Sequence, residues 1–107
     1  MSKLFETLER LAATIDSRKG GDPAASYTAK LLANPKLAAK KLGEEAVEMV
    51  IAAVAQGPDE LAGESADLLY HWLVLLAASG VSLDAVAEKL AAREGTSGLA
   101  EKAARTQ

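Results

Sequence analysis

Residues 35–78 read PKLAAKKLGEEAVEMVIAAVAQGPDELAGESADLLYHWLVLLAA, and this segment sets the architecture of the chain. Helix-forming residues fill it on both sides of one interruption at Gly57-Pro58. Proline cannot continue a helix, and Asp59 just after it has the short acceptor side chain of an N-cap. We therefore expect two long helices, at about 35–56 and 59–79, that pack against each other as an antiparallel pair.

Both of these helices are apolar around most of their circumference. Residues 49–55 (MVIAAVA) and 68–78 (LLYHWLVLLAA) have almost no polar position, which is typical of a helix covered on all sides. One small chain cannot cover both helices, so we predict that a second copy completes a four-helix core. The chain is thus expected to form a homodimer.

The rest of the chain also favours helices. Apolar residues recur at every third or fourth position between residues 4 and 15, and Ser26 and Ser82 are suited to cap two further segments. Alanine (23) and leucine (16) abound, whereas valine and isoleucine together number eight, which disfavours strands. The shorter helices are predicted at about 3–17, 27–33 and 83–93. Residues 1–107 are therefore expected to form a single all-α domain, a bundle of about five helices.

The net charge of −3 is divided unevenly along the chain. Residues 42–88 carry nine acidic side chains and no lysine or arginine, whereas residues 1–41 sum to +4 and residues 89–107 to +2. A solvated helical surface normally carries both positive and negative side chains, so the acidic block indicates that a cation from elsewhere balances its charge. An acidic chain is a poor nucleic-acid binder, and no nucleic-acid partner is expected.

Composition excludes other classes of protein. The chain has no cysteine, so disulfides, thiolate metal sites and cysteine nucleophiles are absent, and a reducing compartment is consistent with this. The longest uncharged run, residues 68–78, is too short for a bilayer, which needs about 20 residues. We expect a cytoplasmic protein with no membrane partner.

The acidic block contains a pattern suited to a metal ion. Glu44, Glu45 and Glu48 fall in one sector of their helix, and Glu64 and Asp67 are neighbours one turn apart on the next helix. Across an antiparallel pair these carboxylates can face each other and bind Mg²⁺ or Mn²⁺, which prefer oxygen ligands. Ordinary surface acids are the competing interpretation. No residue of this cluster has a basic partner three or four positions later, which favours the metal site.

Several motifs resemble a known family. The carboxylate helices, KLGEEAVE (41–48) and ESAD (64–67), resemble the all-α nucleoside triphosphate pyrophosphohydrolases. Within that superfamily, more specific segments are similar to phosphoribosyl-ATP diphosphatases: RKGGDP (18–23), SYTAKL (26–31), ADLLYH (66–71) and SGLAEK (97–102). The resemblance implies hydrolysis of phosphoribosyl-ATP to phosphoribosyl-AMP and pyrophosphate, a step of histidine and hence amino-acid biosynthesis.

The resemblance also implies roles for the acidic residues. Mg²⁺ ligands are expected at Glu45, Glu48, Glu64 and Asp67, with Glu44 beside them as a ligand or as the base that orients water. The catalytic residues are then Glu44, Glu45 and Glu48. The chain departs from the family pattern at Gly63, which can loosen its helical turn, and at Trp72, which is expected to serve packing.

Basic and hydroxyl residues upstream are candidates for the nucleotide substrate. Basic groups near a metal–phosphate site make charge-assisted hydrogen bonds, and hydroxyls can bind ribose or phosphate. The predicted substrate-binding residues are Arg18, Lys19, Ser26, Tyr27, Thr28, Lys30 and Lys41. Ser26 serves equally well as a plain helix cap. His71, the only histidine of the sequence, is either a core residue or one that orients a metal ligand. Lys102 and Arg105 in the tail are further candidates for the substrate phosphates.

Two alternatives to this activity stay open at the level of sequence. A related house-cleaning enzyme that cleaves dCTP or another nucleotide would carry the same carboxylates, although the SYTAKL segment disfavours it. A non-catalytic helical dimerisation module would tolerate loss of the acids. The number of metal ions, the general base and the phosphorus that is attacked are left open.

Overall fold

A computed structural model describes residues 2–95 of the chain, and it contains five helices. Within that range no strand occurs, so the predicted all-α class is confirmed. The helices are α1 (Lys3–Asp16), α2 (Tyr27–Leu32), α3 (Pro35–Ala55), α4 (Pro58–Ala78) and α5 (Leu83–Ala91). Each lies within two residues of its predicted bounds.

Helix starts follow capping chemistry. The hydroxyls of Ser26 and Ser82 accept hydrogen bonds from the backbone N–H three residues on, as predicted. Asp59, however, does not cap α4, and that prediction is wrong. The helix begins earlier, at Pro58, with Gly57 as an N-cap that makes no side-chain hydrogen bond. Proline suits the first helical position because its missing N–H has no intrahelical partner there.

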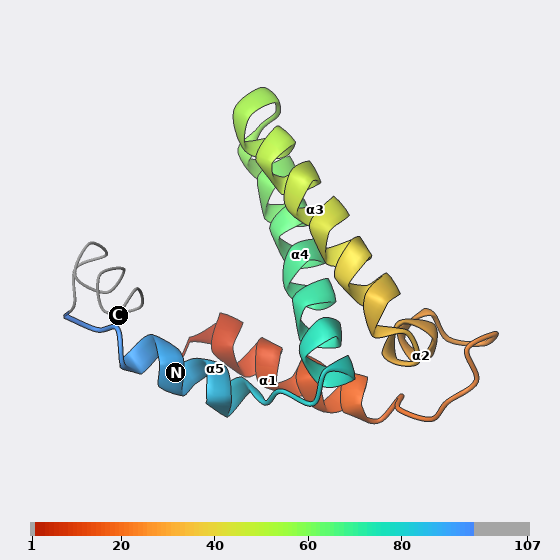
Figure 1. Cartoon of the computed structure of the whole chain (residues 1–107). Helices are drawn as coiled ribbons and strands as arrows, with labels where there is room; N and C mark the ends of the chain where they lie inside the picture. The colour runs from red at the N-terminus through yellow and green to blue at the C-terminus, as the bar shows by residue number, and fades with distance from the viewer. Residues whose placement is uncertain (1, 96–107) are drawn as a thin grey trace, which may run out of the picture.

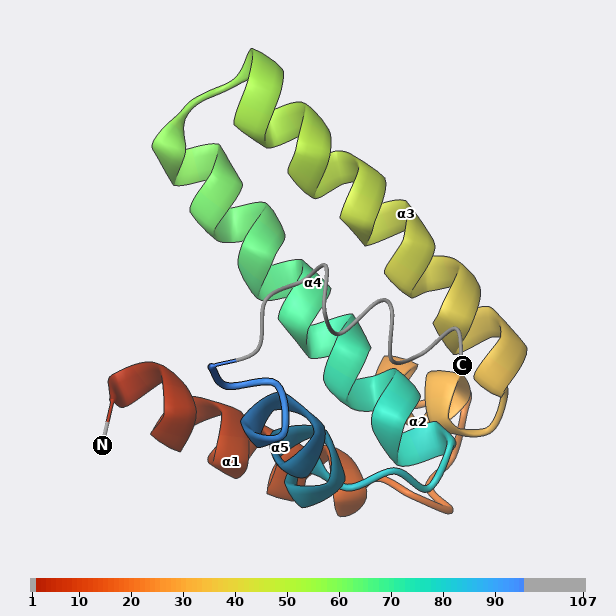
Figure 2. The same cartoon turned by 60° about the vertical axis from the view of Figure 1, so that its left-hand side comes forward.

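The two long helices form an antiparallel hairpin, and the other three gather near its open end (Figures 1 and 2). The turn between α3 and α4 projects away from α1, α2 and α5 in both views. Helix α2 contacts both α3 and α4, and α1 contacts α4. The core therefore sits at the open end of the hairpin. Its buried residues are Ile15, Leu31, Ala38, Leu73 and Val74.

The second half of α3 is largely uncovered within one chain. Val47, Val50, Ile51 and Val54 are exposed, and Val54 keeps 79% of its surface accessible. Helical spacing places these four residues on one face, away from α4. The all-round apolar pattern of this segment is thus not satisfied inside a single copy.

Among residues 2–95, no single helix is long and apolar enough to cross a membrane. Only α4 and α5 taken together reach that length and composition, and they are bent by 108°.

Candidate active site

The hairpin brings carboxylates from its two helices together. Glu45 and Glu48 come from α3 and Glu64 comes from α4. One carboxylate oxygen of each lies within 4.8 Å of the other two. Three of the four predicted metal ligands therefore converge, because an antiparallel pair places adjacent turns of facing helices side by side.

Two oxygens of this cluster are buried without compensation. Among the described residues, neither Oε2 of Glu45 nor Oε2 of Glu64 has a hydrogen-bond partner, and both are inaccessible to solvent. Burial, followed by the negative charge of Glu48, raises the pKa of both carboxyl groups. An unpaired buried carboxylate is costly, and a hard divalent cation is the partner that satisfies several carboxylates at once. The donor set fits Mg²⁺ or Mn²⁺.

The other two acids lie at the edge of the cluster. Asp67 is not among the three converging ligands, but its charge is one of the causes that raise the pKa of Glu45 and of Glu64. Glu44 instead pairs with Lys41, at 3.4 Å between carboxylate oxygen and ammonium nitrogen. Both side chains of this ion pair are exposed, so the pair is weak. Each side chain can therefore leave it for another charged partner. Gly63 does not interrupt α4, which runs unbroken past Glu64.

Helix α2 is attached to α4 through the predicted substrate segment. The hydroxyl of Tyr27 lies 3.1 Å from Nε2 of His71, and Thr28 hydrogen-bonds the hydroxyl of Tyr70. These partners are more than 40 residues apart in sequence. Nothing in the sequence spacing of Tyr70 indicates its hydrogen bond to Thr28.

Ser26 takes the simpler of its two predicted roles. Its side chain accepts a hydrogen bond from the backbone N–H of Ala29, as an N-cap does. A substrate contact by Ser26 stays a prediction. Trp72 is half-buried against the core, in keeping with the packing role expected of it.

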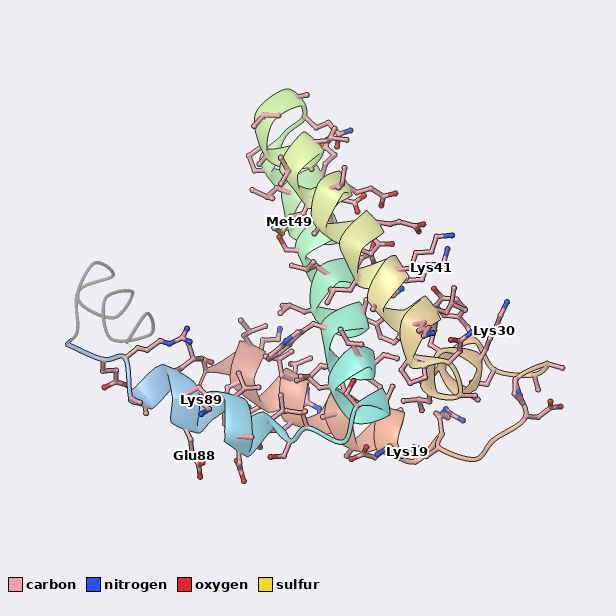
Figure 3. All side chains as sticks on the ribbon, in the orientation of Figure 1. Lys19, Lys30, Lys41, Met49, Glu88 and Lys89 are labelled. Carbon is pink, nitrogen blue, oxygen red and sulfur yellow. The ribbon has the colours of Figure 1, made fainter. Side chains whose placement is uncertain are left out.

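The basic residues divide into two groups. Lys30 and Lys41 project from the same side of the molecule, at the α2–α3 end (Figure 3). Lys19 lies elsewhere, at 3.4 Å from Asp16. It lines a cavity with Ala77, nearly three turns of α4 beyond Asp67.

Lys19 and Arg18 are thus not brought to the carboxylates within one chain. Arg18 is exposed in the turn after α1, where its carbonyl accepts a hydrogen bond from Gly21. Lys102 and Arg105 lie outside the described residues. The substrate roles of all four stay predictions.

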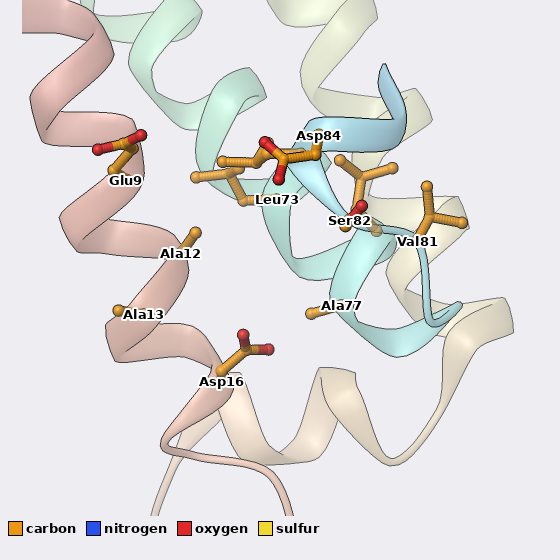
Figure 4. A pocket seen from close by; sticks show the side chains of 11 residues that line it. Glu9, Ala12, Ala13, Asp16, Leu73, Ala77, Val81, Ser82 and Asp84 are labelled. Atoms are coloured by element: carbon orange, nitrogen blue, oxygen red, sulfur yellow. The ribbon is translucent and has the colours of Figure 1, made fainter. Parts of the chain in front are cut away.

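Two hollows flank the hairpin. One, of about 430 Å³, is apolar and is lined by Leu42 and Ala46 of α3 with Leu68, Leu69 and Trp72 of α4. The other, of about 320 Å³, lies between α1, α4 and the start of α5 (Figure 4). Glu9, Asp16 and Asp84 stand around it, and its described lining does not include the clustered carboxylates.

An all-α hairpin with carboxylates drawn from two facing helices places the chain in the class of all-α pyrophosphohydrolases, hydrolases of phosphoanhydride bonds. The family described as phosphoribosyl-ATP pyrophosphohydrolase matches residues 8–94. The chain belongs to this family, as its motifs predicted.

Individual relatives agree with this assignment. A phosphoribosyl-ATP pyrophosphatase of Caulobacter sp. (strain K31) is 87% identical over 105 residues, which cover 98% of each chain. That of Caulobacter vibrioides (strain NA1000 / CB15N) is 80% identical over 96% of each chain. One from Cereibacter sphaeroides (strain KD131 / KCTC 12085) is 61% identical over 92% of this chain and 96% of the relative. The predicted activity on a small nucleotide substrate is confirmed, and neither the dCTP-cleaving enzyme nor the non-catalytic module is favoured.

Proposed function

We propose that this chain hydrolyses phosphoribosyl-ATP with Mg²⁺ held by Glu45, Glu48, Glu64 and Asp67. The observation that carries the metal assignment is the pair of buried, unpartnered oxygens on Glu45 and Glu64 within the carboxylate cluster. Mn²⁺ has similar ligand preferences and is expected to substitute. The reaction breaks the bond between the α- and β-phosphates and releases pyrophosphate and phosphoribosyl-AMP.

The protein side chains around the cluster have distinct roles in this proposal. A cation bound there supplies neutralisation of phosphate charge and a lowered pKa of water. Glu44 stands next to the cluster on α3 and is the candidate base that orients the attacking water, or a further ligand. Lys30 and Lys41 lie on one side of the molecule and are suited to bind phosphate oxygens through charge-assisted hydrogen bonds. Tyr27 and Thr28 are held by α4 and are candidates for substrate contacts.

We also propose that the active enzyme is a homodimer. The exposed apolar face of α3, formed by Val47, Val50, Ile51 and Val54, supports this assembly, and so does the apolar hollow beside Trp72. A second hairpin packed on this surface would remove it from water and complete a four-helix core. Arg18 and Lys19 are then candidates to reach substrate in the assembled dimer. Location in the cytoplasm is part of the same proposal, supported by the absence of cysteine.

One assay tests the proposed activity and its metal. Purified protein is incubated with phosphoribosyl-ATP, and in parallel with dCTP and other nucleotides, with Mg²⁺ or with a chelator. Pyrophosphate release is measured. We expect release from phosphoribosyl-ATP that depends on Mg²⁺. Turnover of dCTP in preference to phosphoribosyl-ATP, or equal turnover in chelator, would contradict the proposal.

A further inference from the structure

The hydrogen bonds of His71 determine where its ring protons are. Its Nδ1 lies 2.8 Å from the backbone oxygen of Asp67, and a carbonyl oxygen can only accept, so Nδ1 carries a hydrogen. In the neutral imidazole, Nε2 is then an acceptor. The hydroxyl of Tyr27, 3.1 Å away, therefore donates its hydrogen to Nε2.

The imidazole is held firmly in this position. His71 is 8% exposed, and its ring packs edge-on against Tyr70, with centroids 4.9 Å apart, and against Tyr27, at 6.0 Å. The hydrogen bonds at both nitrogens and these ring contacts leave it little freedom to rotate.

Tyr27 extends from this buried partner to the surface of the protein. The residue keeps 49% of its surface accessible. Burial raises the pKa of its phenol, Lys41 lowers it, and the charges of Glu45 and Glu44 raise it further. The phenol is therefore within electrostatic range of a candidate phosphate-binding lysine and of the carboxylate cluster.

We propose that His71 is a positioning residue that takes up the only hydroxyl hydrogen of Tyr27, so that Tyr27 meets the substrate solely as a hydrogen-bond acceptor. Phosphate oxygens of the substrate are themselves acceptors and cannot pair with it. Ribose hydroxyls are donors and can. Tyr27 thus contacts the ribose part of the substrate and leaves the phosphates to the lysines and the metal. This inference rests on the proposed function and chooses between the two roles that sequence left open for Tyr27.

The hydrogen bonds of His71 are directed away from the carboxylate of Asp67. Its Nδ1 is directed to the backbone oxygen of Asp67 and its Nε2 to α2, so neither nitrogen is free to orient the Asp67 carboxylate. Loss of the imidazole should therefore affect substrate binding through Tyr27 and leave metal affinity unchanged.

A double-mutant cycle tests whether His71 acts through Tyr27. Tyr27→Phe, His71→Asn and the double variant are assayed with phosphoribosyl-ATP at saturating Mg²⁺. Loss of one hydrogen bond is expected to raise KM about three- to tenfold, with kcat changed less than about twofold. The double variant should bind no worse than Tyr27→Phe alone. Additive effects, or a fall in kcat at unchanged KM, would overturn the proposal.

His71→Gln provides the matched control for His71→Asn. A glutamine amide can reach the position of Nε2 and accept the hydrogen of Tyr27, whereas an asparagine amide can reach only the position of Nδ1. Glutamine should therefore restore KM to within about twofold of the native value. Equal losses in both variants would mean that His71 serves packing alone. If His71→Asn fails to fold, the other two variants still test the proposal, because a raised KM in His71→Gln or an unchanged KM in Tyr27→Phe would overturn it.

Direct binding separates the ribose contact from a phosphate contact. Calorimetry with Tyr27→Phe should show weaker binding of phosphoribosyl-AMP and unchanged binding of pyrophosphate and of Mn²⁺. Weaker binding of pyrophosphate would show that Tyr27 contacts phosphate and would refute the inference. Failure of the native chain to hydrolyse phosphoribosyl-ATP would instead count against the proposed function.

Discussion

Replacement of Glu48 by glutamine should make the metal-free protein more stable and the enzyme nearly inactive. Glu48 supplies one of the three converging carboxylates, and its charge raises the pKa of both Glu45 and Glu64. Glutamine keeps the shape of the side chain and removes its charge. Opposite changes in stability and activity indicate a cation site. Replacement of an acid with a purely structural role would instead lower both properties or change neither.

The size of the stability gain follows from Coulomb's law. Two unit charges 4.8 Å apart, the limit for these ligand atoms, repel by about 0.9 kcal/mol at the dielectric constant of water and about 3.5 kcal/mol at a value of 20. Glu48 is exposed, so we use the lower figure for its pair with Glu45. A gain of about 1 kcal/mol raises the Tm of a domain of this size by about 4–8 °C.

The assay is a thermal unfolding series at pH 7.5 and one protein concentration, with chelator and with Mg²⁺, beside steady-state kinetics. Without metal, Glu48→Gln should melt above the native protein. With Mg²⁺ it should gain less stability than the native protein does, and its kcat/KM should fall by at least about 100-fold. Glu88→Gln is the matched control, since it makes the same chemical change on α5, away from the cluster (Figure 3). It should alter neither property.

Two results would refute this reasoning. Lower metal-free stability in Glu48→Gln would mean that the carboxylates do not repel one another in the folded protein. Native activity with unchanged Mg²⁺ dependence would show that Glu48 is not a ligand.

Three further predictions concern the proton balance, the dimer and the core. Because the pKa of Glu45 is raised above its ordinary value of 4.5, mainly by burial, this carboxyl group in the metal-free folded state loses its proton at a higher pH than in the unfolded chain. The stability of the native protein should therefore fall relative to that of Glu45→Gln as pH rises above 4.5. Saturating Mg²⁺ should remove this trend. A difference in metal-free Tm that does not depend on pH would contradict the prediction. Val50→Lys combined with Val54→Lys places charge on the exposed face of α3. Sedimentation experiments should show that this double variant is a monomer and the native protein a dimer. A native protein that is monomeric at micromolar concentration would contradict the proposed dimer. Leu31→Ala empties a fully buried site and should lower the free energy of unfolding in urea by about 2–5 kcal/mol, whereas a loss below about 1 kcal/mol would mean that α2 contributes little to the core.

Helix content and most boundaries could be predicted because they depend on neighbours in sequence. Serine at positions 26 and 82 caps the helix that it precedes, since its acceptor reaches a backbone N–H only three residues away. The error at Asp59 has the same local origin. Two residues could begin α4, and the preference of proline for the first turn decided in favour of Pro58.

The acidic cluster could be predicted in composition but not in geometry. Helical spacing placed Glu45 and Glu48 on one face, and antiparallel packing against α4 added Glu64. That Asp67 lies outside the closest group, and that Glu44 pairs with Lys41, depends on how far each side chain leans toward the partner helix. Periodicity predicts the direction in which a residue points from its own helix. It does not predict how deeply the side chain lies between two packed helices.

Local sequence therefore settled which segments are helical, where most of them start and which residues carry charge. Tertiary structure alone decided which oxygens lose contact with water, as at Glu45 and Glu64, and which distant residues hydrogen-bond each other, as Tyr27 and His71 do. The physical reason is range. Capping and helix propensity act over one turn of chain, whereas burial and hydrogen bonds across 44 residues exist only after α2, α3 and α4 have packed together.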